Sequence, residues 1–133
     1  MQISFYMLII MNTINILKKF RHLYDFQLIH KNKHVGSCKL MIHDKNAIIN
    51  HIYIDDSHKK QGLGSLLLQE TEQILKKDHS VQEISLLAWQ PGGSFEIVDF
   101  YKKNGYLHKY NKSDVYDDHV TLFDLHHMYK ILK

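Results

Sequence analysis

A chain of 133 residues with 44% hydrophobic residues is long enough for one domain around a single core, which excludes a disordered or fibrous protein. Its formal charge of +3 is too small an excess to argue for nucleic-acid binding, although it favours an anionic ligand. The single cysteine, Cys38, excludes an internal disulfide and indicates a reducing compartment such as the cytoplasm. The 11 histidines are scattered without the cysteines or carboxylates of zinc motifs, so we expect no metal site.

The first part of the chain predicts strands and one short helix. Residues 3–11 form an apolar run that is too short to span a bilayer and lacks the marks of an export signal, so we predict a first strand over 4–10 and no membrane partner. Residues 13–23 predict a helix that begins near Asn12 or Thr13, residue types favoured at helix N-caps. Segments 25–31, 34–43 and 47–54 then indicate three strands with short turns, an antiparallel meander.

The stretch from 52 to 77 indicates a phosphate-binding loop between a strand and a helix. The amides of a helix's first turn have no intrahelical partners and lie at the positive end of the dipole, so they can hold an anion. Gly62 and Gly64 leave a ligand free access to these amides, and Lys59 and Lys60 add positive charge. The loop lacks the Gly-Lys-Ser/Thr end of nucleotide triphosphatases and the third glycine of dinucleotide folds. An ordinary glycine-containing turn is the alternative.

The rest of the chain predicts a strand, a helix and two further strands. Residues 81–89 indicate a buried strand that follows a crossover helix and should run parallel to the strand ending at Ile54. Residues 94–105 predict an amphipathic helix, with Ser94 as a candidate N-cap and Asn104-Gly105 as the stop signal. We expect a strand from 106 to 110, a polar loop over 111–118 and a final strand over 125–132.

Two segments, in this order, resemble the GNAT superfamily of N-acetyltransferases. The basic residue Lys59, two spacers, Gly62, one spacer and Gly64 are similar to the superfamily's coenzyme A loop, and residues 100–106 (Phe-Tyr-Lys-Lys-Asn-Gly-Tyr) are similar to the segment that ends its fourth helix. The resemblance covers roughly residues 25–132. It implies a single α/β domain over 1–133, with a mixed, mostly antiparallel central sheet and helices on both faces. Two N-terminal helices usually shape the acceptor site in that superfamily, and this chain has room for little more than one.

The resemblance also implies acetyl-CoA as the co-substrate and a primary amine of a small molecule or protein as the acceptor. The pantetheine would pair with the backbone of residues 52–54, and the pyrophosphate would lie on the loop amides. Lys59 stands where Arg or Gln is usual, Asp56 where proline is common, Ser94 where Asn often contacts pantetheine, and Ile97 where alanine is customary. The implied coenzyme-binding residues are Ile52, Tyr53, Ile54, Lys59, Lys60, Gln61, Gly62, Leu63, Gly64, Ser65 and Ser94.

Two proton transfers decide which residues would be catalytic. An amine with a pKa of about 10.4 is mostly protonated at pH 7, and the leaving thiolate needs a proton or a strong hydrogen bond. Tyr101 stays protonated at neutral pH and is the candidate acid, with core packing as the alternative. Ile48 stands where many relatives carry a glutamate, so His51 is the candidate base, acting directly or through water, and a surface histidine is the alternative.

Other functions stay open at this point. A degenerate relative could bind coenzyme A or a macromolecular partner without turnover, and both Lys59 and the missing acidic residue favour it. A nucleic-acid-binding module would need clustered basic residues, whereas the lysines form dispersed pairs. The last strands of such folds often pair between subunits, which allows a homodimer.

Overall fold

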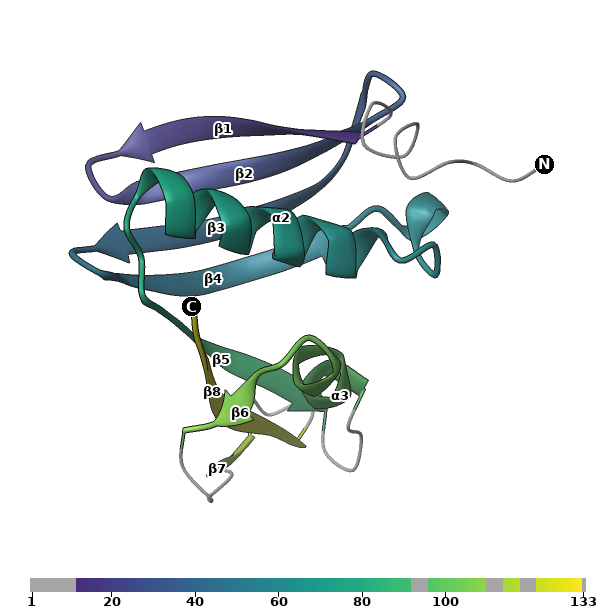
Figure 1. Cartoon of the computed structure of the whole chain (residues 1–133). Helices are drawn as coiled ribbons and strands as arrows, with labels where there is room; N and C mark the ends of the chain where they lie inside the picture. The colour runs from purple at the N-terminus through teal and green to yellow at the C-terminus, as the bar shows by residue number, and fades with distance from the viewer. Residues whose placement is uncertain (1–11, 92–95, 110–113, 118–121, 133) are drawn as a thin grey trace.

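The protein folds around one large sheet. The computed structural model describes residues 12–91, 96–109, 114–117 and 122–132. They form an eight-stranded sheet with the strand order β1-β2-β3-β4-β5-β8-β6, and β7 also pairs with β8 (Figure 1). The elements are β1 (Asn12–Phe20), β2 (Leu23–His30), β3 (Lys33–His43), β4 (Asn46–Ile54), the 3-10 turn η1 (Asp56–His58), α2 (Leu63–Asp78), β5 (Glu83–Pro91), α3 (Glu96–Lys103), β6 (Leu107–His108), β7 (Asp114–Asp117) and β8 (Leu122–Ile131).

The predicted antiparallel meander is confirmed as β2, β3 and β4, and β1 extends it by one strand. Lys31 and Asn32 form the turn between β2 and β3, both with positive φ values, of 51° and 65°. Two consecutive left-handed residues make a turn whose twist matches that of the flanking strands. This turn allows β2 and β3 to pair antiparallel, as predicted.

The predicted helix over 13–23 is wrong, because this segment is strand β1 and pairs antiparallel with β2 from Asn12↔His30 to Phe20↔Leu23. β-Branched residues at Thr13, Ile14 and Ile16 suit a strand better than a helix. Pairing with a strand that has a buried face outweighs a local N-cap preference. The strand predicted over 4–10 lies outside the described residues.

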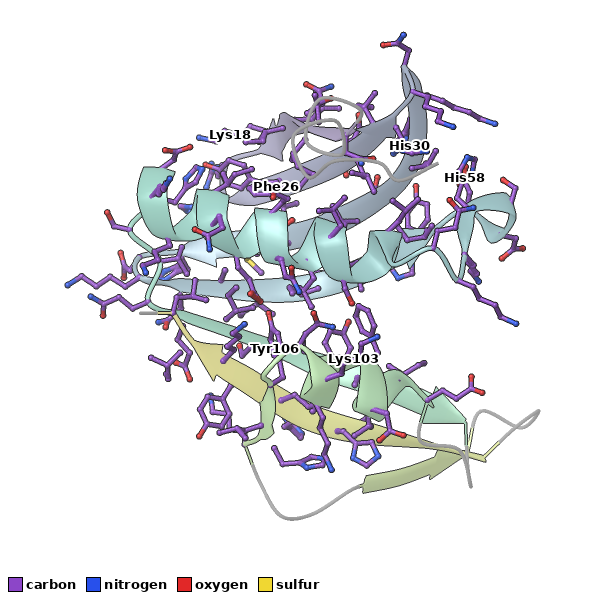
Figure 2. The ribbon with its side chains drawn as sticks, turned by 45° about the vertical axis from the view of Figure 1, so that its right-hand side comes forward. Lys18, Phe26, His30, His58, Lys103 and Tyr106 are labelled. Atoms are coloured by element: carbon purple, nitrogen blue, oxygen red, sulfur yellow. The ribbon has the colours of Figure 1, made fainter. Side chains whose placement is uncertain are left out.

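Both described helices pack on the same face of the sheet. Figure 1 shows α2 lying across strands β1 to β4 and α3 beside β5 and β8. Asn104, just after α3, donates a hydrogen bond from Nδ2 to the Ser65 hydroxyl of α2 at 3.1 Å, so the two helices meet. Phe26, which is completely buried, lies between β2 and α2 (Figure 2). The opposite face carries no helix within the described ranges, in contrast to the helices expected on both faces, and it exposes Ile48 and Leu87.

The C-terminal half follows the predicted order of strand, helix and strands. β5 runs parallel to β4 after the crossover through α2. β8 pairs antiparallel with the whole length of β5. The polar loop predicted over 111–118 is wrong for residues 114–117, which form strand β7 against β8. No helix in the described part of the chain is both long and apolar enough to cross a membrane.

A β-bulge in β4 determines which side chains face the helices. Leu40 of β3 pairs with Ile49 and Lys39 pairs with His51, so Asn50 is an extra residue. The bulge shifts the alternation of side chains by one position. Before it Ile49 faces the core, and after it Ile52 packs against the core while His51 is exposed.

Candidate functional site

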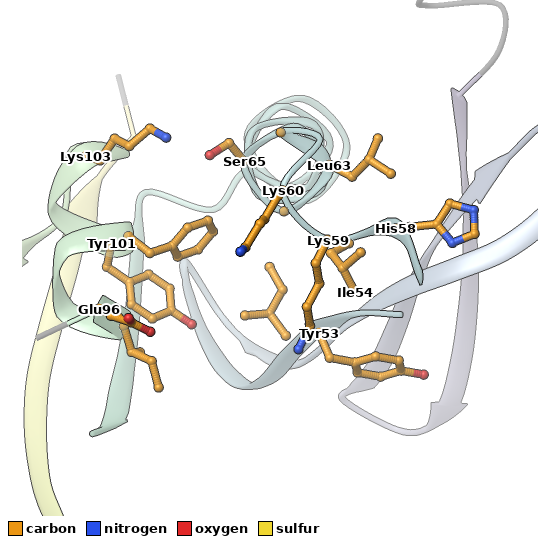
Figure 3. Close-up of a pocket in the computed structure, with 15 residues that line it drawn as sticks. Tyr53, Ile54, His58, Lys59, Lys60, Leu63, Ser65, Glu96, Tyr101 and Lys103 are labelled. Carbon is orange, nitrogen blue, oxygen red and sulfur yellow. The ribbon is translucent and has the colours of Figure 1, made fainter. Parts of the chain in front are cut away.

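A hollow of about 510 Å³ opens between the end of β4, the start of α2 and α3 (Figure 3). Three separate elements form its walls, so it exists only in the folded chain. Its lining residues are Ile52, Tyr53, Ile54, His58, Lys59, Lys60, Gly62, Leu63, Gly64, Ser65, Glu96, Ile97, Phe100, Tyr101 and Lys103.

The β4 wall presents backbone groups that its parallel neighbour does not use. The pairing of β4 with β5 runs from Asn46↔Glu83 to Ile49↔Leu86, and the remaining residues of β4 have no described partner in β5. The separation begins at the bulge, as expected from the extra twist that a bulge gives to a strand. Backbone amides and carbonyls at the end of β4 can therefore pair with an extended ligand.

Gly36 of β3 allows the end of β4 to approach closely, a role that was not predicted from the sequence. It pairs with Ile54, and a Cβ added at Gly36 would lie 2.5 Å from Ile54 Cδ1 and 2.6 Å from the Tyr53 carbonyl oxygen. Any side chain at this position would have to push β4 away from β3. The β4 wall of the hollow thus depends on a glycine in the neighbouring strand.

The loop wall has the conformation expected of an anion-binding helix start. Gly62, the N-cap of α2, has a φ of 76°, a conformation that residues with a side chain rarely adopt. A Cβ added at Gly62 would meet no atom within 4 Å, so it is the backbone conformation and not the space that favours glycine. A Cβ at Gly64 would lie 3.4 Å from the Phe100 ring, an ordinary contact. No side chain among the described residues caps α2 at Gly62, and its first turn carries no acidic residue. The first amides of α2 therefore remain available to a ligand.

Positive charge surrounds this helix start. The Lys60 ammonium points into the hollow, and Lys103 approaches it from α3 (Figure 3). Lys59 forms an ion pair of 2.8 Å with Asp56, and the Lys59 hydrogen bond lowers the pKa of the Asp56 carboxyl. Glu96, at the start of α3, is the carboxylate among the lining residues. The balance of charge at the hollow favours an anion.

The α3 wall carries a buried tyrosine whose hydroxyl points into the hollow (Figure 3). The Tyr101 residue is only 6% exposed, and its ring packs edge-on against Phe100 and Tyr106 at centroid distances of 5.2 and 5.5 Å. Burial raises the pKa of Tyr101 above its ordinary value, and nearby Cys38 adds to this. The phenol thus stays protonated and can donate a hydrogen bond to a developing negative charge.

The hollow brings together most of the predicted coenzyme-binding residues with Tyr101, but not all of the predicted site. His51 does not line it: His51 is exposed on the opposite sheet face, with its ring 5.3 Å from that of Tyr53. Gln61 lines a neighbouring hollow in which His30 and His58 lie side by side, with ring centroids 5.9 Å apart (Figure 2). Ser94 lies outside the described residues.

Five lining residues were not predicted as site residues from the sequence: His58, Glu96, Ile97, Phe100 and Lys103. Glu96, Phe100 and Lys103 share one face of α3 at a spacing of four and then three residues, so helical periodicity could have pointed to them. His58 reaches the hollow only through the turn η1, for which no local signal existed.

The overall fold is similar to that of solved acetyltransferase structures. The structure superposes on the ribosomal-protein-S18-alanine N-acetyltransferase from Escherichia coli with a TM-score of 0.78 and 18% identity, covering 92% of this chain and 95% of that one. A GNAT family acetyltransferase from Elizabethkingia anophelis with acetyl-CoA bound superposes with a TM-score of 0.71 and 13% identity, covering 92% of this chain and 99% of that one. The spermidine N-acetyltransferase from Vibrio cholerae in complex with CoA and spermine superposes with a TM-score of 0.70 and 16% identity, covering 84% of this chain and 67% of that one.

The TM-scores of these superpositions establish a shared fold, and the match of the sequence to a family model establishes the family. No curated protein matches the chain significantly. Residues 23–107 match the family model for the acetyltransferase (GNAT) domain, and this segment contains β2 to β5, the glycine loop, α2 and α3. Because that match spans well over half of the sequence and includes the whole described hollow, the chain belongs to the GNAT family of acetyltransferases.

Proposed function

We propose that this protein transfers the acetyl group of acetyl-CoA to a primary amine of a small molecule or protein. The observation that carries the proposal is the hollow itself, because it joins a strand end that is not paired with β5, an uncapped helix start and the hydroxyl of Tyr101. Relatives of the same fold have acetyl-CoA bound or are named for spermidine and for a ribosomal protein as acceptors. The reduced, buried Cys38 suits the cytoplasm as the site of action.

The residues of the hollow fit the two parts of this co-substrate. The backbone of residues 52–54 would pair with the amides of pantetheine, and the apolar side chains of Ile52 and Ile97 would face its aliphatic part. The amides of Leu63, Gly64 and Ser65, together with Lys60, would hold the pyrophosphate. Lys59, already paired with Asp56, would add a weaker contact than the arginine common at this position.

Acetyl-CoA would supply an activated acetyl thioester. The amine nitrogen forms a bond to the carbonyl carbon, the carbon–sulfur bond breaks, and the nitrogen loses one proton. Tyr101 would donate a hydrogen bond to the departing sulfur. A thiol has a lower ordinary pKa, about 8.5, than a phenol, about 10, and burial raises that of Tyr101 further, so Tyr101 stabilises the thiolate without transferring its proton completely. The amine proton would pass to water, because the candidate base His51 lies on the opposite sheet face and does not line the hollow.

Calorimetric titration with acetyl-CoA tests the binding half of the proposal. Lys60→Glu places a negative charge in the hollow, and Lys76→Glu makes the same change in the last turn of α2. We expect the Lys60 variant to lose at least tenfold in affinity, which corresponds to about 1.4 kcal/mol, and the Lys76 variant to stay within twofold. Equal effects of the two variants, or no binding by the wild type at millimolar ligand, would refute the site.

Binding of coenzyme A without turnover is the second candidate function. The Lys59–Asp56 ion pair and the apolar Ile48, which stands where a base is common, favour it. Release of free thiol from acetyl-CoA separates the two candidates, with spermidine and a peptide with an N-terminal alanine as the first acceptors. Acceptor-dependent thiol release supports the enzyme, whereas tight binding without release across an amine panel supports the binding protein.

A further inference from the structure

Asn104 connects the two helices that form opposite walls of the hollow. It follows α3 directly and is buried at 7% exposure. Its Nδ2 donates to the Phe100 carbonyl oxygen at 2.9 Å and to Ser65 Oγ at 3.1 Å, and its Oδ1 accepts a hydrogen bond from Gln69 Nε2 at 3.2 Å. One side chain therefore bridges the helix of Tyr101 and the first turn of α2.

The orientation of this amide is fixed by the backbone. The Phe100 carbonyl can only accept, so the nitrogen and not the oxygen of the Asn104 amide must face it. The same nitrogen then meets Ser65 Oγ, which becomes the acceptor in that contact. A hydroxyl has one hydrogen to donate, and that of Ser65 is consequently directed to a different acceptor. Ser65 lines the hollow, and its side chain projects from α2 toward α3 (Figure 3).

The backbone of Asn104 is also held in place. Lys130 Nζ donates to its carbonyl oxygen at 2.9 Å and forms an ion pair with Glu72 Oε1 at 2.8 Å. Ser65, Gln69 and Glu72 are spaced by four and then three residues and so form one stripe along α2. The stripe aligns α2 against the end of α3 by directional hydrogen bonds, which fix the relative position of two helices more sharply than apolar contacts do.

We propose that Asn104 is a positioning residue for coenzyme binding, which orients the Ser65 hydroxyl as a hydrogen-bond donor toward the anionic part of the ligand. The inference rests on the proposed function, because it assigns a role within the same hollow. Asn104 itself does not line the hollow and acts through Ser65. It predicts that the effect of removing the Asn104 amide on coenzyme affinity depends on the presence of the Ser65 hydroxyl.

A double-mutant cycle on the dissociation constant for acetyl-CoA tests this dependence. The variants are Ser65→Ala, Asn104→Ala and the double variant, and Asn104→Leu repeats the cycle with a side chain that fills the space without polar atoms. We expect Ser65→Ala and Asn104→Ala each to weaken binding about tenfold, the effect of one hydrogen bond to a charged group. In the Ser65→Ala background, loss of the amide should change binding by less than twofold.

One control separates positioning from a loss of structure. Gln69→Ala removes the exposed partner of Asn104 Oδ1 but leaves the bonds to Phe100 and Ser65, so affinity should stay within twofold. A wild type that does not bind acetyl-CoA would overturn both the proposed function and this inference. Binding by the wild type with additive effects in the cycle would overturn the inference alone.

Discussion

The buried ion pair between Lys130 and Glu72 gives a prediction about stability. Lys130 Nζ lies 2.8 Å from Glu72 Oε1, and Tyr106 donates its hydroxyl to Glu72 Oε2 at 3.0 Å. At this separation the direct attraction is about 6 kcal/mol with an effective dielectric constant of about 20, most of which the loss of hydration offsets. Removing one partner leaves a charge with little compensation, and this costs about 3–5 kcal/mol in a fully buried pair.

Lys130→Met should therefore lower the free energy of unfolding by about 2–3 kcal/mol, at or just below the lower end of that range. The reason is that the Lys130 side chain is 28% exposed, so water can reach the Glu72 carboxylate once the lysine is gone, although Glu72 itself is only 8% exposed. The corresponding fall in the melting temperature is roughly 10 °C for a domain of this size. Urea denaturation followed by circular dichroism measures the change.

A double-mutant cycle combines Lys130→Met with Glu72→Gln, which keeps an acceptor for the Tyr106 hydroxyl but removes the negative charge. We expect Glu72→Gln in the Lys130→Met background to restore roughly 1–2 kcal/mol, because no uncompensated carboxylate remains. Lys77→Met, at an exposed position of α2, is the matched control and should stay within about 0.5 kcal/mol of the wild type. A Lys130 variant as mild as the Lys77 variant, or strictly additive effects, would refute the reasoning.

Three further predictions concern the hollow and the core. Tyr101→Phe should leave the melting temperature and acetyl-CoA affinity unchanged and lower the rate of thiol release about 10²- to 10³-fold; an unchanged rate would remove Tyr101 from the chemistry. In urea denaturation, Gly62→Ala should cost about 1–2 kcal/mol because φ is 76° there, whereas Gly64→Ala should stay within about 0.5 kcal/mol; the reverse order would contradict the assigned roles. Burial raises the pKa of the Cys38 thiol to about 12, so the folded chain keeps a proton that the unfolded chain loses near pH 9. Stability should consequently fall between pH 9 and 10 by up to about 1.4 kcal/mol, and Cys38→Ala should flatten that slope in denaturation curves.

Local signals predicted the elements whose structure is determined locally. A helix was expected in the last part of the stretch from 52 to 77, and α2 spans Leu63–Asp78, because its apolar face repeats at helical spacing. The glycine loop was also predictable, since a residue with positive φ at a helix start leaves its mark in the sequence as Gly62. The stop at Asn104-Gly105 is confirmed by the φ of 90° at Gly105.

The parts that were missed depend on partners distant in the sequence. β1 is a strand because its backbone pairs antiparallel with β2. The polar residues Asn12 and Thr13 gave a misleading local signal for a helix start. β7 exists only against β8 in the same way. The exposure of His51 on the sheet face opposite the helices follows from the bulge at Asn50, which is set by the register with β3.

The bulge in β4 also predicts which changes this position can accept during evolution. Asn50 is the extra residue and its side chain is exposed, so substitutions there should be tolerated. Deletion of its codon would join Ile49 directly to His51 in a regular ladder with β3. Ile52 and Ile54 would stay on the core side, but the added twist would be lost at the point where β4 separates from β5. A deep mutational scan that reads folding and acetyl-CoA binding separately should therefore show that loss of Asn50 spares folding and impairs binding.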